Sequence, residues 1–184
     1  MKIWVTSDLH FSHKNIIKFC PTTRGHYSDV DHMNSDMIRM WNEKVQPDDL
    51  VYIMGDIAFC SAQDAAKIVR SLAGNKILIT GNHDSKLVQQ KVFTSCFRNI
   101  YQYHELRHNG MFIVMFHFPI FDHNQAGRGS VMLHGHRHGN PHNLPGRIMD
   151  VGFDATGEIV VGLDDILEKM KKIDFITHHR PGEA

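Results

Sequence analysis

Side chains that commonly bind metals gather at five places in this 184-residue sequence, each just past a run of apolar residues. The groups are carboxylates, imidazoles and an amide, without a thiolate. Such a mixture suits borderline divalent ions such as Mn²⁺, Fe²⁺, Zn²⁺ or Ni²⁺ rather than Cu(I) or an iron–sulfur cluster. The residues are Asp8 and His10, then Asp56, then Asn82, His83 and Asp84, then His117, and finally His134, His136 and His138. The pattern predicts a metal site.

The spacing within two of these groups indicates how ions would be shared. In an extended strand, residues i and i+2 place their side chains on the same face. Asp8 with His10, and His136 with His138, could therefore each chelate one ion or straddle two. Asp56 stands alone as a carboxylate and could bridge a pair of ions.

Each residue also has an ordinary structural explanation when it is taken singly. Asp8 could cap the next helix, Gly55-Asp56 could form a turn, and His117 could be a hydrogen-bonded core histidine. The chain contains 15 histidines, so some must be surface residues. The joint occurrence of the ligand types after successive apolar runs favours the metal site.

The elements that must position these residues alternate in the first half of the chain. Short apolar runs that end abruptly in polar residues predict strands, and capped segments with helical periodicity predict helices. The expected strands are 2–7, 50–54 and 76–80, and the expected helices begin near residue 13 and span 31–45 and 61–74. This alternation favours a sheet with helical crossovers, whose carboxyl edge is where sites assemble.

The second half changes character. Two strand-like runs within 101–119 surround Asn109-Gly110, which is the strongest short hairpin signal. Further strands are expected at 130–136, 147–152 and 158–163, and a closing helix at 164–172. We expect one domain over residues 1–174 and a frayed tail over 175–184, a length that is sufficient for a large hydrophobic core.

The composition limits the kinds of partner that the protein is expected to bind and the compartment in which it is expected to occur. Lysine plus arginine and aspartate plus glutamate each number 20, so no global charge would recruit nucleic acid or an anionic membrane. The 3 cysteines are widely spaced, which disfavours disulfides and a thiolate zinc site. The first residues are too short an apolar run for a signal peptide or a membrane span. We expect a soluble, cytoplasmic protein.

Ordered motifs identify a family resemblance. The set DLH (8–10), GD (55–56), GNHD (81–84), HFP (117–119) and GHRH (135–138) resembles the pattern DxH, GD, GNH[DE], H and GHxH of the calcineurin-like metallophosphoesterase superfamily. The match runs from residue 8 to residue 138. The resemblance implies an α/β fold of two sheets in a sandwich flanked by helices.

The resemblance also implies a dinuclear centre. One ion would be held by Asp8, His10, Asp56 and His138, and the second by Asp56, Asn82, His117 and His136. The two ions would share a bridging hydroxide that attacks phosphorus in line. His83 would protonate the leaving oxygen or steady the phosphoryl group, and Asp84 would orient His83. Mn²⁺ or Fe²⁺ is expected, with Zn²⁺ or Ni²⁺ as alternatives, whereas His134 matches no ligand position.

The implied activity is hydrolysis of phosphodiesters, as in the small single-domain phosphodiesterase branch. The alternatives are a phosphomonoesterase with the same site and a catalytically inactive scaffold of the same fold. The substrate would be a small phosphate ester, such as a nucleotide or an RNA end. Arg24 and Arg128 lie in loops where each could clamp a phosphate. The oligomeric state is not indicated by the sequence.

Overall fold

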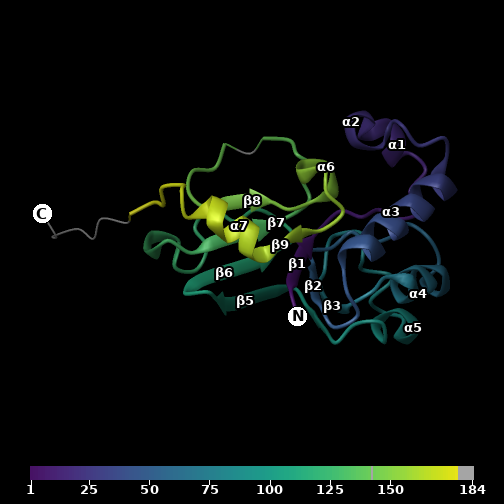
Figure 1. The fold of residues 1–184 in the computed structure, drawn as a ribbon, viewed down its shortest axis with the longest axis horizontal. Coiled ribbons are helices and arrows are strands. Elements are labelled where there is room, and N and C mark those ends of the chain that lie inside the picture. Colours follow the sequence, from purple (N-terminus) through teal and green to yellow (C-terminus); the bar gives the residue numbers. More distant parts are fainter. Residues whose placement is uncertain (142, 178–184) are drawn as a thin grey trace, which may run out of the picture.

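Two β-sheets pack against each other and are flanked by helices, which confirms the α/β sandwich (Figure 1). The computed structural model describes residues 1–141 and 143–177. The first sheet has the order β4-β3-β2-β1-β9, in which β1 to β4 are parallel and β9 is antiparallel to β1. Its strands are β1 (Ile3–Thr6), β2 (Leu50–Ile53), β3 (Asn75–Ile79), β4 (Asn99–Tyr101) and β9 (Val161–Gly162).

The second sheet begins with the expected hairpin and has the order β5-β6-β7-β8. Its strands are β5 (Tyr103–His108), β6 (Met111–Phe116), β7 (Val131–His134) and β8 (Ile148–Asp150). The hairpin turn consists of Asn109 and Gly110, whose φ angles of 47° and 77° both lie in the left-handed region that a two-residue turn of this hand requires. β6, β7 and β8 run parallel to one another.

The longer helices begin where the sequence provides capping side chains. Asp29 accepts hydrogen bonds from the backbone amides of Asp31 and His32 before α3, and Ser61 accepts one from Asp64 before α4. The helices are α1 (Ile16–Phe19), α2 (Pro21–Arg24), α3 (Val30–Lys44), α4 (Ala62–Ser71), α5 (Lys91–Thr94), α6 (Phe153–Thr156) and α7 (Leu163–Met170), with a 3₁₀ turn η1 (Ala126–Arg128).

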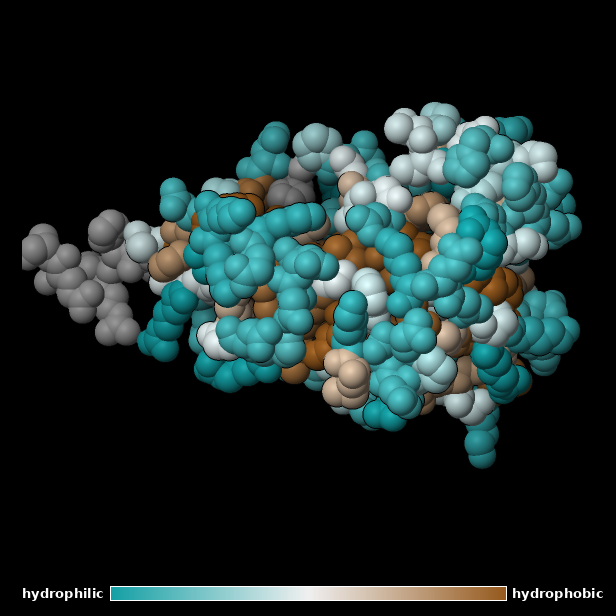
Figure 2. All heavy atoms as spheres, in the orientation of Figure 1, coloured by the Kyte–Doolittle hydropathy of each residue, from teal (hydrophilic) through white to brown (hydrophobic). Residues whose placement is uncertain are grey.

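Alternating residues of the parallel strands build two cores. Val51, Ile53 and Leu78 face the core that includes residues of α3 and α4, on the right of the first sheet in Figure 1. Tyr52 and Ile77 face the opposite core, shared with the second sheet and α7. This period of two is what a sheet covered on both faces requires. In Figure 2 the visible surface is mostly hydrophilic, and apolar side chains show mainly toward its centre.

Two expected strands differ from the structure. The run that starts at residue 101 divides, because β4 pairs with β3 in the first sheet before β5 begins the second sheet. The strand expected at 158–163 is limited to β9. Ile159 and Val160 are adjacent yet both belong to the helix-side core, which a pleated strand does not allow.

The structure tests the expectations for the two ends of the chain only in part. The expected tail overlaps residues 178–184, which lie outside the described residues. The single-domain boundary at residue 174 stays a prediction. Among the residues that the structure describes, no helix is both long and apolar enough to cross a membrane. Cys20, Cys60 and Cys96 are free thiols.

We predict that Leu78→Ala lowers the free energy of unfolding by about 2–5 kcal/mol, because Leu78 is fully buried and the change leaves a cavity. Urea denaturation followed by circular dichroism measures the loss. The matched control is Ile173→Ala at a side chain that is 40% exposed, where a change of at most about 0.5 kcal/mol is expected. Equal losses in both variants would contradict the assignment of the core.

Candidate metal centre

The loops that follow the strands of both sheets meet at one place. The loop after β1 runs beside the loop after β2, with hydrogen bonds from the amide of Asp8 to the carbonyl of Gly55 (3.1 Å) and from that of His10 to that of Asp56 (3.0 Å). The loop after β7 joins them, because the amide of His136 donates to Asp8 Oδ2 (2.9 Å). Carboxyl ends of parallel strands thus converge as expected.

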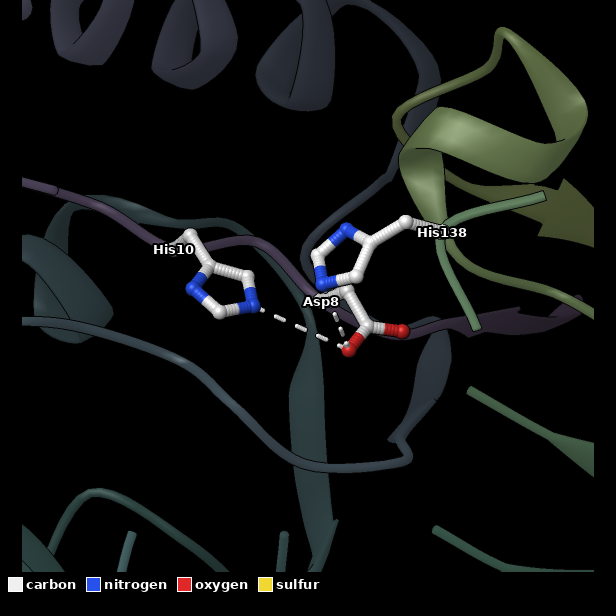
Figure 3. Close-up of side chains that lie close together, drawn as sticks. All are labelled: Asp8, His10 and His138. Atoms are coloured by element: carbon white, nitrogen blue, oxygen red, sulfur yellow. Dashed lines mark ion pairs between the residues drawn. The ribbon is translucent and has the colours of Figure 1, made fainter. Parts of the chain in front are cut away.

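The first group of potential ligands consists of Asp8, His10 and His138, whose side chains point toward one another in Figure 3. Asp8 Oδ1 lies 3.8 Å from His10 Nε2 and 3.9 Å from His138 Nε2. These distances are too long for hydrogen bonds. Asp8 Oδ1 and both ring nitrogens of His10 are buried without a hydrogen-bond partner. Buried polar atoms without partners are costly, so this set of atoms fits a cation.

The second group is built around His117. Its Nδ1 donates to the carbonyl oxygen of Met54 (2.7 Å), so in the neutral ring Nε2 carries a lone pair. That nitrogen faces Asn82 Oδ1 at 2.9 Å and Asp56 Oδ2 at 3.5 Å. This lone pair and the two oxygen atoms repel one another, and a cation bound between them would remove the repulsion. The donor set of imidazole, amide oxygen and carboxylate suits a divalent metal.

Asp56 lies between the two groups. Its Oδ2 is 3.7 Å from His10 Nε2 on one side and 3.5 Å from His117 Nε2 on the other. The same oxygen is 3.9 Å from His83 Nε2, and Oδ1 accepts the backbone amide of His83 at 2.9 Å. This position is the one that a bridging carboxylate would need. The ring of His136 packs on that of His117, with centroids 5.2 Å apart, so it lies beside the second group.

The protonation states favour metal binding. Burial alone would raise the pKa of the Asp8 carboxyl, but the imidazoles of His10, His117 and His138 around it hold that pKa below its ordinary value. Asp8 is therefore ionised at neutral pH. Burial lowers the pKa of His10 and of His136, which keeps both rings neutral. Burial would also lower the pKa of His138, but its hydrogen bond to Asp154 and the charges of Asp8 and Asp154 outweigh burial and raise that pKa, so this ring binds a metal only after it loses its proton.

The backbone reaches this geometry through left-handed residues and not through extended strands. Asp8, His10, Asp56, His136 and His138 have φ angles of 55°, 49°, 56°, 70° and 49°. The expected alignment of i and i+2 side chains on one strand face is therefore wrong, because these pairs lie in loops past the strand ends. Each such residue costs about 1–2 kcal/mol relative to a right-handed conformation. Strained residues of this kind cluster at functional sites.

Two glycines of the motifs allow the loops to approach the carboxylates. A Cβ atom on Gly135 would overlap the side chains of Ser7 and Asp8, and one on Gly81 would overlap the carboxylate of Asp56. Gly81 and Gly135 must therefore lack a side chain for the loops of this centre to pack together.

The role expected for Asp84 needs correction. Its carboxylate is fully buried and accepts the backbone amides of Gly81 (2.8 Å), Asp56 (2.9 Å) and Ile57 (3.0 Å). The hydrogen bonds described for this carboxylate do not include the ring of His83. Asp84 therefore joins the loop after β2 to the loop after β3 and fixes the backbone of Asp56.

Arg24 also differs from the expectation of a phosphate clamp, because its side chain has no exposed surface. Its guanidinium donates to the carbonyl oxygens of Asp8 (2.7 Å) and Leu9 (2.8 Å) and forms a bidentate pair with Asp154 (2.8 and 2.9 Å). A substrate could not reach it without unfolding this region. Arg24 instead supports the loop that carries Asp8 and His10.

Asp154 is a functional candidate that sequence reasoning missed. Its Oδ2 accepts a hydrogen bond from His138 Nδ1 at 2.8 Å, which leaves Nε2 of that ring directed at Asp8. Burial alone would raise the pKa of Asp154, but His138 and Arg24 hold it well below its ordinary value. The stretch DVGFDATGE around it lies past the matched motifs, so the only signal was an acidic residue in a short segment bounded by Gly152 and Gly157.

Arg128 lies in η1, before the amino end of β7, and this is the end away from the candidate centre. For Arg128 to clamp a phosphate at the centre, the loop of residues 122–130 would need both ends near the metals, which requires β6 and β7 to be antiparallel. They are parallel, with Ile113 opposite Val131 and Met115 opposite Leu133. The loop must therefore return to the amino end of β7, whereas His136 follows its carboxyl end. Arg128 precedes β7 and is not placed at the centre.

The chain is similar to several known proteins. The sequence matches the model of the family described as calcineurin-like phosphoesterase over residues 1–183. It is 34% identical over 179 residues to an uncharacterised protein of Methanocaldococcus jannaschii, an alignment that covers 93% of this chain and 92% of the relative. The Gene 66 protein of Mycobacterium phage L5 is 27% identical over 201 residues, with 92% of this chain and 94% of the relative covered.

A solved structure shares the fold. A protein of unknown function from Aquifex aeolicus superposes with a TM-score of 0.72 at 22% identity, and the alignment covers 91% of this chain and 98% of that chain. At this identity the likeness concerns the fold alone.

We predict that Asp154→Asn weakens Mn²⁺ binding by about 10–100-fold, because His138 loses the carboxylate that orients it. Calorimetric titration of the metal-free protein measures the affinity. The variant is also destabilised, since buried Arg24 loses its partner, so the titration is made well below its melting temperature. Asp48→Asn at an exposed residue is the matched control. Unchanged affinity in a folded Asp154→Asn protein would refute the role of Asp154.

Proposed function

Because the chain belongs to the calcineurin-like phosphoesterase family, we propose that it is a metal-dependent phosphodiesterase with two ions at the candidate centre. The observation that carries this proposal is the set of buried, unpartnered ligand atoms of Asp8 and His10, next to Asp56 between two groups of imidazoles. Mn²⁺ or Fe²⁺ is the ion that we propose, and the nitrogen and oxygen donors also suit Zn²⁺ or Ni²⁺.

The proposed ligand sets share one residue. Asp8, His10, Asp56 and His138 would hold one ion, and Asp56, Asn82, His117 and His136 the other. When bound, the ions supply a nucleophile from water at neutral pH and positive charge for the phosphoryl oxygens. The chain's own contribution is to fix these side chains. Asp84 holds the backbone of Asp56, Arg24 holds the backbone of Asp8, and Asp154 orients the ring of His138.

His83 is proposed to give a proton to the leaving oxygen. Its side chain is 47% exposed, while its backbone amide is anchored on Asp56 Oδ1. The ring therefore lies at the edge of the centre, where it can reach both solvent and a bound ester. Its neighbour Asn82 faces the second group, which would place the phosphoryl group within reach of the ring.

The positions of Arg24 and Arg128 favour diesters over monoesters. A phosphomonoester carries one more negative charge than a diester and is commonly held by an arginine fork. Arg24 is buried in its pair with Asp154, and Arg128 lies toward the other end of β7. A small diester, such as one that contains a nucleotide, is therefore the substrate that we propose.

We predict that the manganese-loaded protein hydrolyses bis(p-nitrophenyl) phosphate with a higher kcat/KM than p-nitrophenyl phosphate. Removal of the metal with a chelator should abolish both activities, and Mn²⁺ should restore them. Release of p-nitrophenolate is followed by absorbance. Activity that survives complete metal removal would contradict the proposal, and a preference for the monoester would replace diesterase with monoesterase activity.

We predict that His83→Ala lowers kcat by about 10²–10⁴-fold for a dinucleoside monophosphate, whose alkoxide leaving group must be protonated. The loss should be much smaller for bis(p-nitrophenyl) phosphate, because p-nitrophenolate leaves without a proton. Metal content, measured by atomic emission, should stay unchanged. His26→Ala, at an exposed histidine, is the control. Equal losses on both substrates would assign His83 to holding the phosphoryl group instead.

A further inference from the structure

A groove of about 470 Å³ opens beside the candidate metal centre. It lies between the segment of α1 and α2 and the loop that leads from His138 to α6, and His138 forms part of its wall. Nε2 of the same histidine faces Asp8 at 3.9 Å. A phosphoryl group held at the centre would therefore have this groove directly at its side.

The chemistry of the wall restricts what the groove can bind. Phe19, whose side chain is 68% exposed, presents an aromatic face, and Thr23 and Asn140 add a hydroxyl and an amide. Asp154 is the one charged side chain among the described lining residues apart from the histidine, and it is paired with Arg24 and His138. The wall offers no cation for a second phosphate, and its polar groups do not suit an aliphatic tail.

A second groove of about 290 Å³ lies on another side of the centre. It is lined by Phe59, Asn82, His83 and Lys86, among others, and shares no lining residue with the first groove. A series of ring contacts separates the two grooves. Phe19 contacts His13 at 6.1 Å between centroids, His13 contacts Phe59 at 4.1 Å, and Phe59 contacts His83 at 4.7 Å.

We propose that the first groove, called the Phe19 groove below, binds the substituent that stays on phosphorus, and that this substituent is a nucleoside whose base stacks on Phe19. The inference rests on the proposed phosphodiesterase function. The assignment of the two substituents follows from the position of the proton donor, which must lie beside the leaving oxygen. His83 lines the second groove, called the His83 groove below, so the leaving group belongs there. Stacking on an exposed aromatic face is how bases without a paired strand are bound.

The reaction then has a fixed direction. Water adds to phosphorus through its oxygen, the bond from phosphorus to the leaving oxygen breaks, and His83 gives that oxygen a proton. The proton released from water balances the one that His83 gives up. The products are an alcohol from the His83 groove and a nucleoside monophosphate from the Phe19 groove.

Two chromogenic diesters with the same leaving group test this assignment. The p-nitrophenyl ester of thymidine 5′-monophosphate and methyl p-nitrophenyl phosphate differ only in the substituent that stays on phosphorus. We expect the wild-type protein loaded with Mn²⁺ to prefer the thymidine ester in kcat/KM. Phe19→Ala should reduce this preference by roughly 5- to 100-fold, as expected for loss of one base stack. Phe19→Tyr should retain it.

The matched control is Phe121→Ala, at a phenylalanine that is 44% exposed and lines neither groove. This variant should keep the wild-type preference. An absence of preference in the wild type, or a preference that survives Phe19→Ala, would overturn the inference. Because Phe19 is largely exposed, its loss is not expected to impair folding.

A binding measurement separates failure of the inference from failure of the proposed function. Calorimetry compares thymidine 5′-monophosphate with methyl phosphate on the wild type and on Phe19→Ala. If the wild type hydrolyses neither diester, the proposed function is wrong, and tighter, Phe19-dependent binding of the nucleotide would still support the groove. If bis(p-nitrophenyl) phosphate is hydrolysed but Phe19→Ala changes neither binding nor preference, only the inference is wrong.

Discussion

A buried carboxylate joins the two sheets of this protein, and the candidate centre depends on it. Asp8 follows β1 of the first sheet, and its Oδ2 accepts the amide of His136, which follows β7 of the second sheet. Its other oxygen faces two imidazoles at distances that leave room for a cation. A charge in this position is tolerated only when its surroundings compensate it. The backbone carbonyl of Asp8 is held by Arg24, so even the support of the carboxylate is buried.

The centre is maintained at the expense of local strain. Several of the proposed ligands, Asp8, Asp56 and His138 among them, have left-handed backbone angles that L-residues rarely adopt. Together such residues cost several kcal/mol, which is a large part of the roughly 5–15 kcal/mol by which domains are stable. The two cores around the parallel strands compensate, since residues such as Ile53 and Leu133 anchor the strands directly before the strained loops. The loops can be strained because the strands that precede them are fixed.

The sequence predicted the groups of the centre better than their supports. The positions of Asp8, Asp56 and His117 followed from ligand types after apolar runs, since parallel strands bring their carboxyl ends together. The role of Arg24 could not be derived, because its partner Asp154 lies 130 residues away in the chain. Arg128 was misplaced because the direction of β7 relative to β6 depends on the path of a long loop and not on local pattern.

The central claim is that distant segments of this chain hold two ions side by side. Crystals of the protein grown with Mn²⁺ and measured at the manganese absorption edge would test it most directly. The account predicts two anomalous peaks about 3.5–4 Å apart, with Asp56 between them, Asp8 and His138 on one ion and His117 on the other. A single peak, or peaks away from Asp56, would contradict it.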